Sequence, residues 1–75
     1  MPDIVMYTTD MCPYCVHAKA LLRRKGMSWQ EKRIDLDFAL AGEMQQRSRQ
    51  RSVPQIFIDD HHVGGYQEMA ELDAL

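Results

Sequence analysis

The chain has 75 residues, about half of an average domain, so we expect a single domain over residues 1–75. Apolar residues make up 45% of it and charged residues 27%, a globular composition that argues against disorder. The net charge of -2 excludes the basic footprint of a nucleic-acid-binding protein. The aliphatic runs are far shorter than the roughly 20 residues of a membrane helix, and the acidic amino terminus does not resemble a secretory signal. We therefore expect a cytoplasmic protein with no membrane partner.

Charge is distributed unevenly along the chain. All nine Lys and Arg residues lie at or before Arg51, together with six of the eleven acidic residues, whereas residues 52–75 hold the other five acids and no cation. A small anionic ligand is therefore expected nearer the first part of the chain than the last. The alternative is that these charges form an ordinary solvated surface.

The first part of the chain predicts a strand followed by a helix. Residues 4–7 are a short run of β-compatible apolar side chains that ends at polar residues, which is typical of a buried strand. Residues 13–25 carry apolar side chains at helical spacing, with Pro13 suited to the first turn and Gly26 to the stop. The residues expected on the apolar side of this helix are Cys15, Val16, Ala18, Leu21 and Leu22.

The rest of the chain predicts two more helices and three more strands. Residues 29–35 resemble a second strand, and Asp37 is a suitable cap for a helix that ends near Ser48. Residues 53–58 form a third strand that begins at a proline, and residues 61–63 form a short fourth strand after a turn. The apolar face of the final helix is expected to consist of Met69, Leu72 and Leu75.

The predicted element order is therefore βαβαββα, and the fold class is α/β. The β-α-β start implies a parallel pair of strands, and the later hairpin implies an antiparallel pair. We expect a mixed four-stranded sheet covered by helices, with Trp29 and the methionines in the core.

Cys12 and Cys15 are the only cysteines, and a disulfide between them closes too small a loop to be a good structural staple. Cys12 lies at the predicted start of the first helix, where unpaired N–H groups and the helix dipole favour a thiolate. This environment lowers the pKa of a cysteine from about 8.5 to roughly 3.5–7.5, which makes Cys12 a nucleophile at neutral pH. Cys15, one helical turn later, can attack a mixed disulfide formed on Cys12. The pair therefore predicts redox catalysis.

A C-x-x-C pair can also be half of a zinc or iron–sulfur site, which needs two further ligands. The candidate ligands are His17, His61 and His62. His17 lies beside the pair on the helix, whereas adjacent residues of a strand, such as His61 and His62, point to opposite faces, so these side chains cannot easily converge. We therefore expect no metal in the monomer.

Three segments of the chain resemble the signature segments of glutaredoxins, in the same order and at similar spacing. They are the motif Cys12-Pro13-Tyr14-Cys15, the run from Ser52 to Ile58, and the pair Gly64-Gly65 before the last helix. The match is closest to the small bacterial dithiol type. The resemblance implies a thioredoxin-like fold, glutathione as co-substrate, and a cis peptide bond before Pro54 that faces the cysteines.

The residues of the second and third segments themselves favour a ligand groove. Pro54 has no N–H, so the N–H and C=O of Val53 can remain free for the peptide group of a ligand. Gly65 lets the backbone approach a ligand closely, and the N–H groups of Tyr66 and Gln67 can bind a carboxylate. The alternatives are a plain strand start and a plain turn between hairpin and helix. In glutaredoxins, the third segment holds the γ-glutamyl end of glutathione.

The chain departs from the family pattern at two places. Thr9 stands where glutaredoxins commonly have a lysine, and Gln67-Glu68 stand where they have an aspartate. We hypothesise that Arg51 binds the glycyl carboxylate of glutathione and that Glu68 meets its γ-glutamyl ammonium group; the alternative is that Arg51 is an ordinary solvated arginine. With Tyr14 packing against the ligand, the predicted substrate-binding residues are Tyr14, Arg51, Ser52, Val53, Pro54, Gly65, Tyr66, Gln67 and Glu68.

The sequence therefore predicts a monomeric, glutathione-dependent thiol-disulfide oxidoreductase that reduces protein disulfides and glutathione mixed disulfides. Cys12 attacks the substrate, Cys15 resolves protein disulfides, and glutathione restores the enzyme. Its partners are glutathione and proteins that carry disulfides or bound glutathione. Two alternatives remain open. One is an iron–sulfur carrier in which two subunits share a cluster through Cys12 and glutathione, which Pro13 counts against; the other is a thioredoxin-like dithiol reductant fed by a flavoenzyme.

Overall fold

The computed structural model describes residues 2–72 and confirms the predicted order βαβαββα. The first three elements are β1 (Ile4–Thr8), α1 (Pro13–Arg24) and β2 (Gln30–Arg33). The last four are α2 (Phe38–Ser48), β3 (Gln55–Ile58), β4 (His61–Gly64) and α3 (Tyr66–Ala70). As predicted, the Asp37 side chain caps α2 by accepting a hydrogen bond from the N–H of Ala39 at 3.0 Å.

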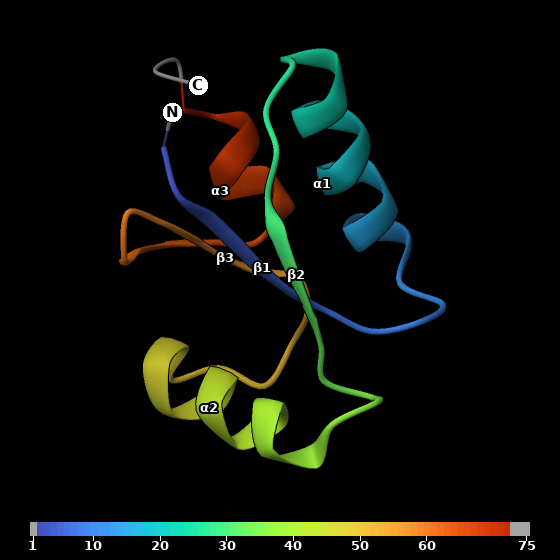
Figure 1. Ribbon diagram of the computed structural model, residues 1–75, viewed down its shortest axis with the longest axis vertical. Coiled ribbons are helices and arrows are strands. Elements are labelled where there is room, and N and C mark those ends of the chain that lie inside the picture. The colour runs from blue at the N-terminus through green and yellow to red at the C-terminus, as the bar shows by residue number, and fades with distance from the viewer. Residues whose placement is uncertain (1, 73–75) are drawn as a thin grey trace.

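The strands form one mixed sheet with the order β2-β1-β3-β4 (Figure 1). β1 and β2 are parallel, as the predicted β-α-β start requires, because a helix connects them. β3 runs antiparallel to both β1 and β4. This arrangement places the loops that follow β1 and β2 at the same edge of the sheet, since the carboxyl ends of parallel strands coincide.

Side chains alternate between the two faces of the sheet, and each face has its own core. Figure 1 shows α1 and α3 on one side of the sheet and α2 on the other. The core under α1 and α3 consists of Ile4, Met6, Ala18, Leu22, Ile56 and Met69. The core under α2 consists of Tyr7, Met44 and Phe57.

A polar cluster anchors α2 to the sheet. The hydroxyl of Tyr7, a fully buried residue of β1, donates a hydrogen bond to the carboxylate of Glu43 and accepts one from Arg47 at 2.8 Å. Burial, together with the bond to Glu43, raises the pKa of Tyr7 above its ordinary value, although Arg47 opposes that rise. The Tyr7 hydroxyl therefore keeps its proton and its bond to α2 at neutral pH.

Two predicted core positions are wrong. Val16 is 60% exposed, because it lies about 100° around α1 from the buried stripe of Cys15, Ala18 and Leu22. Met11 is 92% exposed, because it precedes α1 in a loop where its φ is +54°. By contrast, Met6, Met44 and Met69 are buried as expected, and Trp29 packs half-buried against the core under α1.

The element boundaries also differ from the prediction at several points. β2 is shorter than the predicted 29–35, and β3 begins at Gln55 because Pro54 has no N–H to donate to the sheet. α3 ends at Ala70 with Leu72 39% exposed, and Leu75 lies outside the described residues. Among residues 2–72, none of the helices has the length and apolar character required to span a bilayer.

Candidate active site

Cys12 and Cys15 form a disulfide at the amino terminus of α1. Cys12 is the cap of the helix, and its Sγ accepts a hydrogen bond from the N–H of Cys15 at 3.1 Å. The first turn of α1 carries no acidic side chain, so nothing there opposes a negative charge on the sulfur. Cys15 is only 1% exposed, whereas Cys12 is half-buried. Cys12 is therefore the sulfur that an incoming thiolate or disulfide can reach.

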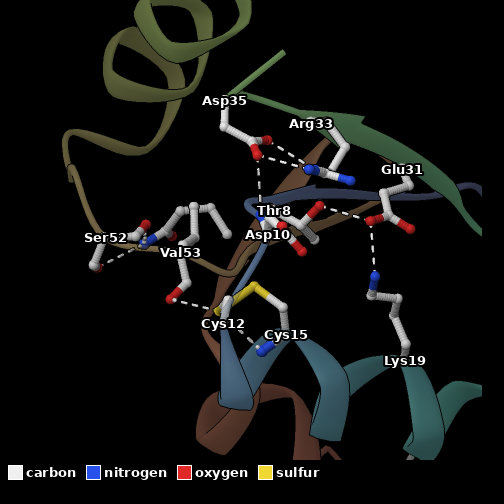
Figure 2. Close-up of a disulfide and its surroundings, with 11 residues drawn as sticks. Thr8, Asp10, Cys12, Cys15, Lys19, Glu31, Arg33, Asp35, Ser52 and Val53 are labelled. Carbon is white, nitrogen blue, oxygen red and sulfur yellow. Dashed lines mark hydrogen bonds and ion pairs between the residues drawn. A yellow bond between two sulfur atoms is a disulfide. The ribbon is translucent and has the colours of Figure 1, made fainter.

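The loop before β3 faces this sulfur from across the site. The Sγ of Cys12 lies 3.8 Å from the carbonyl oxygen of Val53, which is 41 residues away in sequence (Figure 2). The peptide bond between Val53 and Pro54 is cis, as the family resemblance implied. The fold therefore brings the first and second predicted segments into contact at the reactive sulfur.

A cavity of about 380 Å³ opens beside this contact, and we refer to it as the Pro54 cavity. Its volume falls within the range of roughly 300–1,000 Å³ found for small-molecule sites. The described lining residues are Tyr14, Gln50, Ser52, Val53, Pro54, Gln55, Gly65, Tyr66, Gln67 and Glu68. They include eight of the nine predicted binding residues, and Arg51, the ninth, is exposed in the same loop but does not lie among them.

The third predicted segment forms one wall of the Pro54 cavity. The carboxylate of Glu68 accepts a hydrogen bond from the N–H of Gly65 at 2.7 Å, which caps α3. Gly64 has a φ of +121°, and a Cβ at this position would lie 2.8 Å from Oε1 of Glu68. Both observations require glycine at position 64. One carboxylate oxygen of Glu68 is thus occupied by the backbone, and a ligand ammonium group would have to meet the other.

Three aromatic rings gather at the same opening. The Tyr14 ring stacks on the Tyr66 ring at a centroid distance of 6.4 Å, and the His17 ring lies 5.7 Å from Tyr66. Tyr14 itself is 64% exposed, so most of its surface remains available to a ligand. The His17 ring, expected beside the cysteine pair on the helix, therefore also lies at this opening.

A second cavity, of about 320 Å³, is lined by the two cysteines themselves and by residues on the far side of the disulfide. We refer to it as the Lys19 cavity, and its described lining residues are Thr9, Asp10, Met11, Cys12, Pro13, Cys15, Val16, Lys19 and Arg33. Figure 2 shows Ser52 and Val53 on one side of the disulfide, and Lys19 and Glu31 on the other.

Ion pairs hold the wall of the Lys19 cavity. Lys19 pairs with Glu31 at 2.8 Å, and Glu31 also accepts a hydrogen bond at 2.7 Å from the hydroxyl of Thr8 (Figure 2). Burial raises the pKa of Glu31, but its bonds to Lys19 and Thr8 outweigh burial and hold that pKa below its ordinary value. The carboxylate therefore remains charged and keeps both partners.

A second pair ties the loop after β1 to the end of β2. Arg33 binds Asp35 at 2.6 Å, and Asp35 accepts a further hydrogen bond from the N–H of Asp10 at 3.1 Å. The Arg33 bond, helped by that of Asp10, holds the pKa of Asp35 well below its usual range. Since Asp10 is two residues before Cys12, this pair helps to fix the start of the active-site loop.

The histidines do not gather around the cysteines as metal ligands. Among residues 2–72, no group of three or more His, Cys, Asp or Glu side chains is placed to hold a metal ion. The ring of His62 instead lies 2.7 Å, through Nε2, from the side-chain oxygen of Gln55. Neither Gln50 nor Gln55 was predicted as a site residue; the available signal was that Gln55 is a polar residue within the apolar run 53–58.

Comparison with known proteins assigns the family. A family model for glutaredoxin matches residues 4–63. The chain belongs to the glutaredoxin family. It is 50% identical over 74 residues to Glutaredoxin 3 of Escherichia coli (strain K12), a match that covers 99% of this chain and 89% of that protein. As a member of this family, the chain is a thiol-disulfide oxidoreductase with a redox-active cysteine pair.

Solved structures of glutaredoxins share its fold. The solution structure of glutaredoxin from Brucella melitensis matches with a TM-score of 0.81 and 44% identity, over 99% of this chain and 80% of that one. The crystal structure of a buckwheat glutaredoxin–glutathione complex matches with a TM-score of 0.84 and 29% identity, over 93% of this chain and 66% of that one. These similarities confirm the thioredoxin-like fold expected for this glutaredoxin.

Proposed function

We propose that this glutaredoxin uses glutathione to reduce protein disulfides and glutathione mixed disulfides. The observation that carries the proposal is the Pro54 cavity, which adjoins the accessible sulfur of Cys12 and is lined by eight of the predicted binding residues. The glutathione complex of the buckwheat relative supports the same ligand for this chain.

In the proposed reaction, the Cys12 thiolate attacks one sulfur of a substrate disulfide and expels the other sulfur as a thiolate. For a protein disulfide, the Cys15 thiolate then attacks Cys12, which releases the second substrate thiolate and forms the Cys12–Cys15 disulfide. One glutathione thiolate opens this disulfide at Cys12, and a second attacks the resulting mixed disulfide to release glutathione disulfide. Two glutathione molecules thus supply the two electrons that the substrate receives.

The proposed binding mode follows from the lining of the cavity. The backbone N–H and C=O of Val53 pair with the peptide of glutathione, and the rings of Tyr14 and Tyr66 pack beside it. The N–H groups of Tyr66 and Gln67, in the first turn of α3, receive the γ-glutamyl carboxylate. Arg51, exposed beside Ser52, supplies the cation for the glycyl carboxylate.

We also propose that the enzyme acts as a monomeric single domain in the reducing cytoplasm. The cysteine pair supports this compartment, because its short loop would stabilise the domain little and its chemistry instead requires a pool of reduced thiols. Glutathione is that pool in many cells, and it is also the proposed ligand.

The two cysteines are predicted to be unequal in reducing a glutathionylated peptide, with glutathione and glutathione reductase as the electron supply. Cys15→Ser should retain turnover, because this substrate needs only the accessible sulfur of Cys12. Cys12→Ser should lose at least about a thousandfold, because the nucleophile is gone. The rate of NADPH oxidation measures both variants, and equal losses in the two would contradict the assigned roles.

Measurements on the wild-type protein also test the two alternative functions, a thioredoxin-like reductant and an iron–sulfur carrier. A folded wild-type protein without glutathione-dependent turnover would favour a thioredoxin-like reductant, and reduction by a flavoenzyme would then be measured. Visible absorbance of anaerobically purified protein would instead favour the iron–sulfur carrier.

A further inference from the structure

Gln55 is a buried polar residue that the reaction above does not use. It is the first residue of β3, is only 2% exposed, and lines the Pro54 cavity. A buried amide requires hydrogen-bond partners, because a buried polar atom without one destabilises the fold. The partners of Gln55 therefore indicate what its side chain does.

The nitrogen of the Gln55 amide faces the loop before β3. It lies 3.0 Å from the carbonyl oxygen of Ser52, 3.3 Å from the hydroxyl of Ser52, and 3.3 Å from the side-chain oxygen of Gln50. A backbone carbonyl can only accept, so the atom nearest to Ser52 must be the NH₂ group. This choice places the oxygen of the amide toward β4.

The oxygen of the Gln55 amide is bound from the other side. It lies 2.7 Å from Nε2 of His62, so His62 must donate the hydrogen at this atom. The His62 ring also packs on the Phe57 ring at a centroid distance of 4.9 Å, which limits its rotation. Gln55 therefore bridges an edge strand, β4, and the loop that reaches Cys12.

The bridge through Gln55 ends at Ser52, next to the part of the loop that contacts Cys12. At its start, the loop is held by Ser48, whose hydroxyl accepts a hydrogen bond from the N–H of Gln50 at 3.1 Å. Pro54, at its end, has no N–H to contribute. The amide of Gln55 supplies the missing tie at Ser52, directly before Val53, and the carbonyl of Val53 contacts the sulfur of Cys12.

We propose that Gln55 is a positioning residue: held by His62, its amide fixes the Ser52–Val53 backbone beside Cys12 and leaves the Ser52 hydroxyl free to donate to an anionic ligand. This proposal rests on the proposed function of the Pro54 cavity as the glutathione site. The amide of Gln55 acts through the loop, since both its nitrogen and its oxygen already have protein partners. The Ser52 hydroxyl accepts from Gln55, so its own hydrogen can point toward the cavity.

The first test replaces the amide with an apolar group of similar size. Gln55→Leu should raise KM for the glutathionylated peptide about five- to tenfold and leave kcat within about twofold, because the groove is displaced while the cysteines are unchanged. The matched control is Gln46→Leu, which changes an exposed glutamine of α2 and should leave both constants unchanged. An unchanged KM in a folded Gln55→Leu protein would overturn the proposal.

The second test uses the neighbouring histidines of β4. His62→Phe keeps a ring on Phe57 and removes the Nε2 that faces Gln55, so it should raise KM about threefold, whereas His61→Phe, at the equally exposed neighbouring position, should not. The double variant Gln55→Leu/His62→Phe should be no worse than Gln55→Leu alone, because His62 acts through Gln55. Multiplying effects would show that the two residues act separately, and would overturn the bridge.

A third readout does not depend on glutathione. The backbone amide NMR signals of Ser52 and Val53 should shift in His62→Phe and in Gln55→Leu, and should stay in place in His61→Phe and Gln46→Leu. If the wild type had no glutathione-dependent turnover but these signals moved as expected, the proposed function would fail and the positioning role would stand. Unmoved signals in a folded variant would contradict the positioning role itself.

Discussion

The two cavities beside the disulfide are stabilised by different interactions. The wall of the Pro54 cavity is held by neutral groups and backbone: the amide of Gln55 binds Ser52, and Gly65 is bound by the one charged residue among the described lining, Glu68. The wall of the Lys19 cavity is held by two ion pairs, Lys19–Glu31 and Arg33–Asp35. Neutral side chains and backbone therefore set the shape of the Pro54 cavity. On the other side of the disulfide, ion pairs support the loops around the Lys19 cavity.

The difference shows how far the charge of a sequence predicts its ligand site. Ion pairs of this partly exposed kind contribute little to stability, and their contribution weakens further in salt. Four cations of the first part of the chain are paired with acids in this way: Lys19, Lys32, Arg33 and Arg47. Three of these cations pair with acids of the same part of the chain, so the pairs leave most of the positive excess before Arg51 in place. The described lining of the Pro54 cavity nevertheless has only one charged residue, the acid Glu68, so the excess does not mark this cavity.

The largest effect is expected where the Pro54 wall needs glycine. Gly64→Ala should lower the free energy of unfolding by about 1–3 kcal/mol, because its positive φ disfavours a side chain and its Cβ would approach Glu68. Gly42→Ala is the matched control: this glycine lies within α2 with nothing near its Cβ, so the change should raise that free energy by about 0.5–1 kcal/mol. Urea unfolding measures the free energy of unfolding of both variants. If that free energy rose in Gly64→Ala as well, the wall of the Pro54 cavity would tolerate a side chain at this position.

A smaller effect is expected at Arg51, the proposed cationic contact for glutathione beside the Pro54 cavity. Arg51→Ala should raise KM for the glutathionylated peptide about threefold, since an exposed charge contributes at most about 1 kcal/mol. The difference from wild type should shrink in high salt. Arg24→Ala, an exposed arginine of α1, is the control. If Arg51→Ala left KM unchanged at low salt, Arg51 would be a solvated residue, and the cavity would bind glutathione without a cation.

The smallest effect concerns the ion pairs of the Lys19 cavity in acid. The pKa of Asp35 is lower in the folded than in the unfolded chain, so its pair stabilises the fold above pH 3.8 and is lost as the pH falls below that value. Asp35→Asn should therefore make the free energy of unfolding less steeply dependent on pH between about 4 and 2. Urea unfolding at several pH values measures this slope. An identical slope in Asp35→Asn would show that the Asp35 carboxylate does not contribute to stability in acid.

Much of the fold follows from local patterns. Pro13 and Gly26 bound α1, Asp37 caps α2, and the run 53–58 contains β3, as predicted. The redox role of the cysteine pair could be predicted equally well, because a C-x-x-C motif at the start of a helix is defined by residues that are neighbours in the sequence. These features could be predicted because the physics that decides them acts within one or two turns of chain.

The features that the sequence did not reveal depend on contacts between distant residues. The bond between Gln55 and His62 exists because His62 pairs with Phe57 across the β3–β4 hairpin, on the face of the sheet where Gln55 also lies, and no local pattern specifies that pairing. Met11 is apolar yet exposed, since the chain turns away from the core before α1 begins. The Lys19 cavity likewise forms only when β2 pairs with β1 and brings Arg33 close to the loop of the cysteines.

The burial of Cys15 has a consequence for how the reduced cysteine pair reacts with a peroxide. A peroxide that reaches this pair in its reduced form meets the half-buried Cys12 and converts its thiolate to a sulfenic acid, the last reversible step before irreversible overoxidation. Cys15 is one helical turn away and shielded from the same peroxide. Its thiol can condense with the sulfenic acid, releasing water and forming a disulfide that thiols can reduce again. The buried sulfur of Cys15 is thus placed to rescue the half-buried sulfur of Cys12 from overoxidation.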